Sequence, residues 1–211
     1  MLLIKATLLS DGSSDRALIP ILEWLLQQQR ARANPSVQWF DPAQSRTRYK
    51  TLAAKITQAL EYYPCDILFI HRDAESRPLE ERVREIETAW TSDERPGQMV
   101  QVIPVRMTEA WLLFDEACIR KASGCPSGRA RLDLPKLAAC EGIADPKQRL
   151  HESLRTASEK SGRHLKKLAP EVAVHRLAEL IPDFSPLRHL SAFQRLETEI
   201  SRALTGTGRT S

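Results

Sequence analysis

Five acidic residues follow apolar runs of strand length, and their types and spacing are those of residues that do chemistry. They are Asp11 and Asp15 in "LLSDGSSDRALIPIL", Asp73 and Glu75 in "DILFIHRDAES", and Glu109 in "TEAWLL". Carboxylates crowded together repel one another, so their ionised form is costly unless a cation shares the site. Such a cluster favours Mg²⁺ or Mn²⁺, and these ions activate water for attack on phosphate esters.

Each acid also has a simpler explanation in local structure. Asp11 suits a tight turn, and Asp15 suits the first turn of a helix, where the helix dipole favours negative charge. Asp73, Glu75 and Glu109 suit helix caps or first turns as well. It is their recurrence after three different strands that indicates a functional site.

The elements that must position these acids alternate between strands and helices. Apolar runs of strand length cover residues 2–9, 37–40, 65–70 and 100–105, and helical spacing covers residues 15–30, 48–62 and 79–90. Ser13 or Ser14 is able to cap the first helix, and residues 109–114 predict the start of a buried helix. This order predicts a doubly wound α/β sheet of about four mainly parallel strands. Ligands bind such sheets at the carboxyl ends of the strands, where the acids fall.

The strand signal fades after Asp115. We therefore expect an α/β core over residues 1–115, a helical cap or extension of the same domain over 116–204, and a flexible tail over 205–211. Residues 1–115 hold 14 Lys and Arg against 16 Asp and Glu, whereas residues 116–211 hold 17 against 11. An acidic half joined to a basic half fits a carboxylate site beside a polyanion-binding surface, although solvated helix faces explain the charges equally well.

The composition is that of a globular protein. The chain has 211 residues, of which 42% are hydrophobic and 27% charged. No run approaches the roughly 20 apolar residues of a membrane span, and the N-terminus lacks signal-peptide features, so we expect a cytoplasmic protein without a membrane partner. The cysteines form no CxxC pair, which favours reduced thiols over zinc or disulfides. The composition is also compatible with a homo-oligomer.

Two of these motifs resemble the Toprim domain of topoisomerases, primases and OLD-type nucleases. The resemblance rests on a strand ending in an acid-Gly pair that opens a helix, and on a later strand ending in Asp-x-acid. The stretches "VIPVRMTEAWLLFD" and "LSAFQRLETEI" are similar to a family of small bacterial Toprim-like proteins that are encoded beside ABC-type ATPases and associated with phage defence. The resemblance implies a Toprim-like core, a Mg²⁺-dependent nuclease activity in anti-phage defence and an ATPase partner.

The resemblance also assigns roles to the acids. Asp11 stands where Toprim proteins carry a glutamate that acts as a general acid/base or metal-linked carboxylate, and Asp73 and Glu75 stand at the Asp-x-Asp metal pair. Glu109 is implied as a further acid near the metals, and Asp15 as a supporting acid. Because Asp11 and Glu75 exchange Asp and Glu relative to the family, their reach changes by one methylene. A catalytically weak, nucleic-acid-sensing or regulatory subunit of an ATPase complex therefore stays an alternative.

Cationic residues supply a candidate nucleic-acid surface. Arg72 and Arg106 flank the acids and could hold phosphates or pair with neighbouring carboxylates. A short basic run suits sequence-independent phosphate contacts, although a solvated helix end explains it equally well; it includes Lys160, Arg163, Lys166 and Lys167, with His164 among them. His71 could relay protons, although a strand-end histidine outside any site fits as well. The leading hypothesis is a nuclease acting on DNA or RNA, and an enzyme acting on small phosphates is a further alternative.

Overall fold

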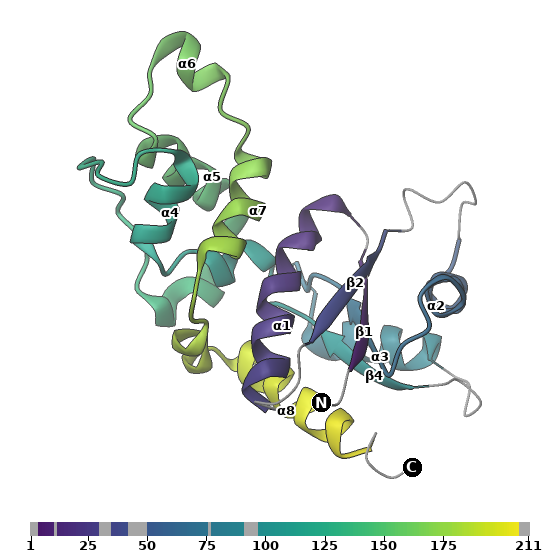
Figure 1. Ribbon diagram of the computed structural model, residues 1–211. Helices are drawn as coiled ribbons and strands as arrows, with labels where there is room; N and C mark the ends of the chain where they lie inside the picture. Colours follow the sequence, from purple (N-terminus) through teal and green to yellow (C-terminus); the bar gives the residue numbers. More distant parts are fainter. Residues whose placement is uncertain are drawn as a thin grey trace.

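The computed structural model describes residues 4–10, 12–29, 35–41, 50–75, 77–90 and 97–206. Its centre is a four-stranded sheet, made of β1 (Lys5–Leu9), β2 (Ser36–Phe40), β3 (Ile67–His71) and β4 (Gln98–Val102). All neighbouring strands are parallel, and their order is β2-β1-β3-β4. Helices flank the sheet and continue to the C-terminal end of the described chain (Figure 1). The predicted α/β fold with a mainly parallel sheet and a helical C-terminal extension is confirmed.

Helices cover both faces of the sheet because each strand sends alternate apolar side chains to opposite faces. Leu68 and Ile70 of β3 pack in one cluster with residues of α2 (Leu52–Tyr62) and α3 (Leu79–Ala89). Ile67 and Phe69 belong to the cluster on the other face, which includes α1 (Leu18–Gln29). A strand buried on both faces reads as a continuous apolar run, which is why "ILFI" shows no polar alternation.

The larger apolar cluster runs without a break from the sheet into the C-terminal helices. Trp111, which is fully buried, packs its ring edge-on against Phe193, with centroids 5.5 Å apart. The elements that follow β4 are η3 (Thr108–Leu112), α4 (Glu116–Ser123), η4 (Leu137–Gly142), α5 (Pro146–Ala157), α6 (Gly162–Lys166), α7 (Pro170–Leu180), η5 (Ser185–His189) and α8 (Ser191–Gly206). We call α4 to α7 and the segments between them the helical lobe.

Several element boundaries differ from those predicted by the sequence, and the start of the first helix is one of them. A 3₁₀ turn, η1 (Ser13–Ala17), precedes α1, whose regular helix starts only at Leu18. Pro20 lies in the first turn of α1, where a backbone N–H has no partner within the helix, so the proline is tolerated there but gives no hydrogen bond back to Arg16 O. Gly12, rather than Ser13 or Ser14, occupies the N-cap position of η1.

The last strand and the last helix also end elsewhere than predicted. β4 ends at Val102, short of the predicted residue 105, and Pro104 cannot donate to a sheet ladder. Where a helix is predicted over residues 109–114, the chain forms the buried 3₁₀ turn η3 over Thr108–Leu112 instead. α8 continues to Gly206, past the predicted start of the tail, and residues 207–211 lie outside the described part of the chain.

Each edge strand of the sheet has a backbone N–H satisfied by a glutamate from a neighbouring helix. Glu23 of α1 accepts a hydrogen bond from Val37 N in β2 (3.1 Å). Glu199 of α8 accepts one from Gln101 N in β4 (2.9 Å). Unpaired edge groups are templates for association with another chain, so these helices protect both edges.

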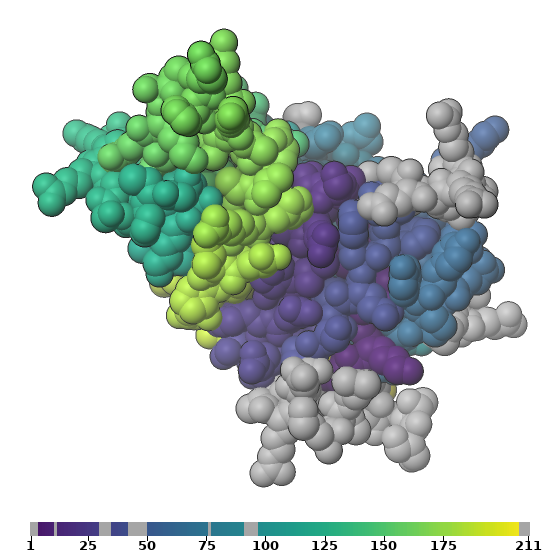
Figure 2. Space-filling model, turned by 45° about the horizontal axis from the view of Figure 1, so that its top comes forward, coloured from purple at the N-terminus to yellow at the C-terminus, as the bar shows by residue number. Residues whose placement is uncertain are grey.

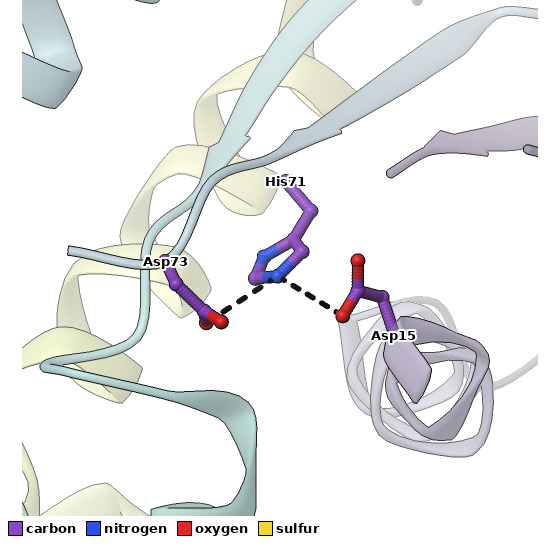
Figure 3. Close-up of side chains that lie close together, drawn as sticks. All are labelled: Asp15, His71 and Asp73. Carbon is purple, nitrogen blue, oxygen red and sulfur yellow. Dashed lines mark ion pairs between the residues drawn. The ribbon is translucent and has the colours of Figure 1, made fainter. Parts of the chain in front are cut away.

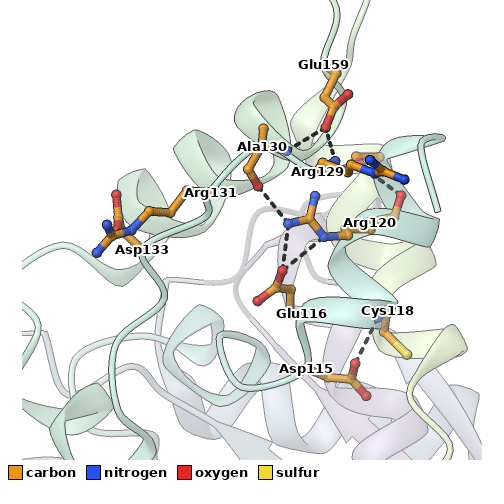
Figure 4. A network of polar contacts seen from close by, with 10 residues as sticks. Asp115, Glu116, Cys118, Arg120, Arg129, Ala130, Arg131, Asp133 and Glu159 are labelled. Carbon is orange, nitrogen blue, oxygen red and sulfur yellow. Dashed lines mark hydrogen bonds and ion pairs between the residues drawn. The ribbon is translucent and has the colours of Figure 1, made fainter. Parts of the chain in front are cut away.

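The irregular segment between α4 and η4 is fixed by polar contacts within the helical lobe (Figure 4). Arg120 pairs with Glu116 at 2.6 Å and donates to Ala130 O at 2.7 Å. Glu159 accepts hydrogen bonds from the backbone of Arg129 and Ala130. These contacts join α4, the following loop and the end of α5, so the lobe holds its shape without strands.

All four cysteines are free thiols, and Cys118 and Cys140 are buried. Among the described residues, none of the helices combines the length and apolar composition that a membrane span requires.

Candidate metal centre

Two loops at the carboxyl edge of the sheet are joined along their backbones. The loop after β3 donates to the loop after β4 from Arg72 N to Val102 O (3.1 Å), from Ala74 N to Pro104 O (3.3 Å) and from Glu75 N to Arg106 O (2.9 Å). Arg82 of α3 adds a hydrogen bond from Nε to Asp73 O (2.9 Å). Asp73 therefore sits on a segment held from two sides.

The turn after β1 directs Asp15 toward these loops. Asp15 Oδ2 accepts a hydrogen bond from Gly12 N (3.1 Å), and Oδ1 accepts one from Ser14 Oγ (3.3 Å). The residue is buried, with 8% of its surface exposed. Groups at the start of the 3₁₀ turn thus bond to the Asp15 carboxylate and hold it in place.

His71, the last residue of β3, lies between two carboxylates (Figure 3). Its Nε2 is 3.7 Å from Asp15 Oδ1 and 3.4 Å from Asp73 Oδ1. Its Nδ1 lies 3.0 Å from Val102 O. A carbonyl oxygen only accepts, so Nδ1 carries the proton and Nε2 is the atom directed at the carboxylates. We call Asp15, His71 and Asp73 the carboxylate–histidine cluster.

Within this cluster, Asp73 is the residue whose pKa is perturbed most clearly. Burial raises its pKa to about 6, the nearby His71 opposes that rise, and the negative charges of Asp15 and Glu109 add to it. Asp73 Oδ1 is buried and accepts no hydrogen bond from the described residues. Buried polar atoms are normally satisfied, so this oxygen is available to a cation as a ligand atom.

Glu109 lies beside the cluster but is not one of its members. It is buried in η3, and burial raises its pKa, while its own backbone N–H and the positive charge of Lys147 on α5 lower it. Asp15 raises the same pKa and His71 lowers it, which marks both as near neighbours. Glu109 thus adds negative charge next to the cluster, and the helical lobe contributes one cation.

The side chain of Glu75 points away from the cluster that contains Asp73. Its φ is +53°, an unusual value for a residue other than glycine, and its side chain is 57% exposed. Glu75 Oε2 lies 3.6 Å from Arg82 Nη2, and the described structure does not bring it into the cluster. The two acids of the Asp-x-acid motif are therefore separated by the backbone turn between them.

The remaining predicted site residues are distributed over the molecule. Arg72 pairs with Glu85 at 2.7 Å, and Arg106 is half-buried in the loop after β4. Asp11 lies outside the described residues. The basic run is exposed on and beside α6, at the end of the helical lobe farthest from the sheet (Figure 1); it comprises Lys160, Arg163, Lys166 and Lys167.

No protein-family model matches the chain, and no curated protein or solved structure shows significant similarity to it.

The cluster fits a single divalent ion. One ligand atom from each of its three side chains lies within 4.8 Å of the other two. His71 also has the orientation expected of a metal ligand, since ligating histidines usually donate their second ring N–H to a carbonyl or carboxylate. Two carboxylates suit Mg²⁺ and Mn²⁺, and an imidazole nitrogen favours Mn²⁺ of the two.

The contribution of His71 was the part of the site least evident in the sequence. The available signal was a polar residue that ends a fully apolar strand at the carboxyl edge of the predicted sheet. The same three side chains are also compatible with an imidazolium between two carboxylates and no metal, and measurement of Mn²⁺ binding distinguishes the two arrangements.

Proposed function

We propose that this protein is a metal-dependent nuclease that hydrolyses phosphodiester bonds with Mg²⁺ or Mn²⁺ at the carboxylate–histidine cluster. The observation that carries the proposal is the position of His71 Nε2 between Asp15 and Asp73 while Nδ1 is fixed by Val102 O. Side chains from the turn after β1, the end of β3 and the loop after it bring possible ligand atoms within 4.8 Å of one another, which local helix caps would not require.

The residues of the cluster and Glu109 would have different roles in the reaction. Asp15 and Asp73 would hold the ion through carboxylate oxygens and His71 through Nε2. A divalent ion there would activate water and offset the charge that develops on the phosphate. Glu109, buried next to Asp15, is the nearby carboxylate available to accept a proton.

The polymeric substrate is inferred from charge. The exposed basic run beside α6 suits phosphate contacts far from the cluster, which a small phosphate ester would not need. A role in anti-phage defence, an ABC-type ATPase partner and a cytoplasmic location rest on the resemblance to Toprim-like proteins and on the sequence composition.

A second candidate function is a catalytically weak, nucleic-acid-sensing or regulatory subunit. The placement of Glu75 favours it, because this acid pairs with Arg82 and leaves the cluster with fewer carboxylates than the family motif implies. Such a subunit would bind nucleic acid or a partner without cutting.

The test is cleavage of linear duplex, circular duplex and single-stranded nucleic acids in Mg²⁺, Mn²⁺ or EDTA. Wild type is compared with Asp73→Asn, and Glu75→Gln is the matched control because it also neutralises one acid of the same motif. We expect metal-dependent cutting that is lost in Asp73→Asn and retained in Glu75→Gln. Binding without cutting under every condition would support the second candidate, and cutting that survives Asp73→Asn would overturn the site.

A further inference from the structure

A cleft opens on the other side of the turn that holds Asp15. It has a volume of about 570 Å³, and its lining includes Ser13, Arg16, Trp39, His175 and Glu179. That volume is within the range of small-molecule sites. Figure 2 shows the three elements that form its walls side by side: the start of α1 with η1, β2 and α7.

The aromatic wall of this cleft is tied to the candidate metal centre by a short chain of hydrogen bonds. Trp39 Nε1 donates to Ser10 Oγ (3.0 Å), and Ser10 Oγ donates to Gly12 O (3.3 Å). Gly12 N in turn donates to Asp15 Oδ2 (3.1 Å). One turn therefore fixes both the indole ring and the carboxylate, and a ligand that spans the turn would contact both.

The lining also contains one cation beside the ring. The Arg16 guanidinium carbon lies 5.9 Å from the centroid of the Trp39 ring, and Arg16 is exposed. Arg16 directly follows Asp15 in η1, so it belongs to the same turn as the metal centre. A guanidinium at that position can contact a phosphate while the ring accepts a planar base.

The remaining polar groups indicate a nucleoside rather than a polyphosphate. His175 is half-buried, and burial together with the charge of Arg16 lowers its pKa, which disfavours its cationic form. Glu23 is occupied by Val37 N, and Glu179 is an exposed carboxylate on α7. With one cation and two carboxylates the cleft would repel a row of phosphates, whereas Glu179 can accept hydrogen bonds from hydroxyl or amino groups.

We propose that this cleft binds the unpaired nucleotide adjacent to the scissile phosphodiester, with its base on Trp39 and its phosphate on Arg16. The proposal rests on the proposed nuclease function and specifies its substrate class. A base in a stack within a duplex cannot reach the ring, so the substrate is a single strand or an unpaired end.

Binding is measured without cleavage, by fluorescence anisotropy of a labelled single-stranded 12-mer in EDTA. The variants are Trp39→Ala, Trp39→Phe and Arg16→Ala. Tyr62→Ala is the control, because it removes another ring, 62% exposed, outside this cleft. Thermal unfolding of each variant checks that it is folded.

We expect Trp39→Ala to weaken binding about 5- to 100-fold, as removal of a stacking side chain does. Trp39→Phe should retain most of the affinity, Arg16→Ala should lower the salt dependence of binding, and Tyr62→Ala should match wild type. A 12-mer with one abasic residue should bind wild type more weakly than the intact strand, and Trp39→Ala should lose that discrimination.

Equal binding by folded Trp39→Ala, Arg16→Ala and wild type would overturn the subsite, even if wild type cuts nucleic acid. Binding that depends on Trp39 in a protein that cuts nothing would retain the subsite and reject the nuclease. Absence of single-strand binding by wild type would overturn the subsite as well.

Discussion

His71 Nε2 lies 3.4 Å from Asp73 Oδ1, a buried oxygen that accepts no hydrogen bond from the described residues. The other ring nitrogen of His71 is held by Val102 O, its register partner on β4. The imidazole is thus fixed by the sheet and directed at a carboxylate that burial and like charges make costly to ionise. A divalent ion between them would relieve that cost.

His71 should contribute directly to metal affinity. We expect His71→Gln to weaken Mn²⁺ binding by at least about 10-fold, since even residues that only orient ligands typically contribute about 10- to 100-fold. Isothermal titration of Mn²⁺ measures the effect. Glu75→Gln is the control and should stay within about twofold of wild type, because Glu75 is exposed and pairs with Arg82. Equal losses in the two variants would contradict the separation of Asp73 from Glu75.

Without metal, Asp73→Asn should stabilise the protein at neutral pH. The folded-state pKa of Asp73, about 6, lies above the ordinary value of 3.8, so wild type loses stability as the pH rises through that interval. The gain in free energy of unfolding should be on the order of 2 kcal/mol at pH 8 and should shrink toward pH 4.5.

Urea unfolding in EDTA at several pH values tests this prediction. Saturating Mn²⁺ should reverse the order, because it stabilises wild type more than Asp73→Asn. A stability difference that does not depend on pH would contradict the raised pKa.

Glu199 should stabilise the β4 edge of the sheet. Glu199→Ala leaves Gln101 N, in a buried residue, without its acceptor, so we expect a loss of about 1–3 kcal/mol in free energy of unfolding. Glu87→Ala removes an exposed glutamate of α3 and should cost less than about 0.5 kcal/mol. Chemical denaturation compares the two, and an equal effect would show that the contact adds nothing to stability.

The α/β core should not fold without the helices that follow it. A fragment of residues 1–115 would expose the sheet face on which Trp111 meets Phe193, because one apolar cluster joins them. We expect this fragment to lack a cooperative unfolding transition and a near-ultraviolet circular dichroism signal, and we expect the full chain to have both. A cooperative transition in the fragment would show that residues 1–115 form a domain of their own.

The order of strands and helices was readable from the sequence because the apolar runs are short and separated by clear helical patterns. The ends of the strands and helices could not be predicted in the same way, since they depend on the hydrogen bonds of individual backbone groups. Pro20, in the first turn of α1, gives no hydrogen bond back to Arg16 O, and a 3₁₀ turn precedes the regular helix there. The segment after β4 does not continue the strand. Its carbonyl groups accept hydrogen bonds from the backbone N–H groups of Ala74 and Glu75 in the loop after β3.

The candidate site was readable only in part. Asp15, Asp73 and Glu109 follow strand ends that the predicted sheet brings to one edge, and the structure places them near one another. The direction of the Glu75 side chain could not be predicted from the sequence. It depends on the positive φ of Glu75 and on its contact with Arg82, and the motif itself shows neither. Trp39 was visible only as a strand residue, since the cleft beside it is formed by α7, far along the chain.

The most direct test of the central claim, that Asp15, His71 and Asp73 hold one divalent ion, is an anomalous difference map from crystals of the full chain soaked in Mn²⁺. We expect a peak between Asp15 Oδ1, His71 Nε2 and Asp73 Oδ1, within about 2.0–2.4 Å of each atom after adjustment of the side chains. No peak there at saturating Mn²⁺, or a peak at Glu75 instead, would contradict it.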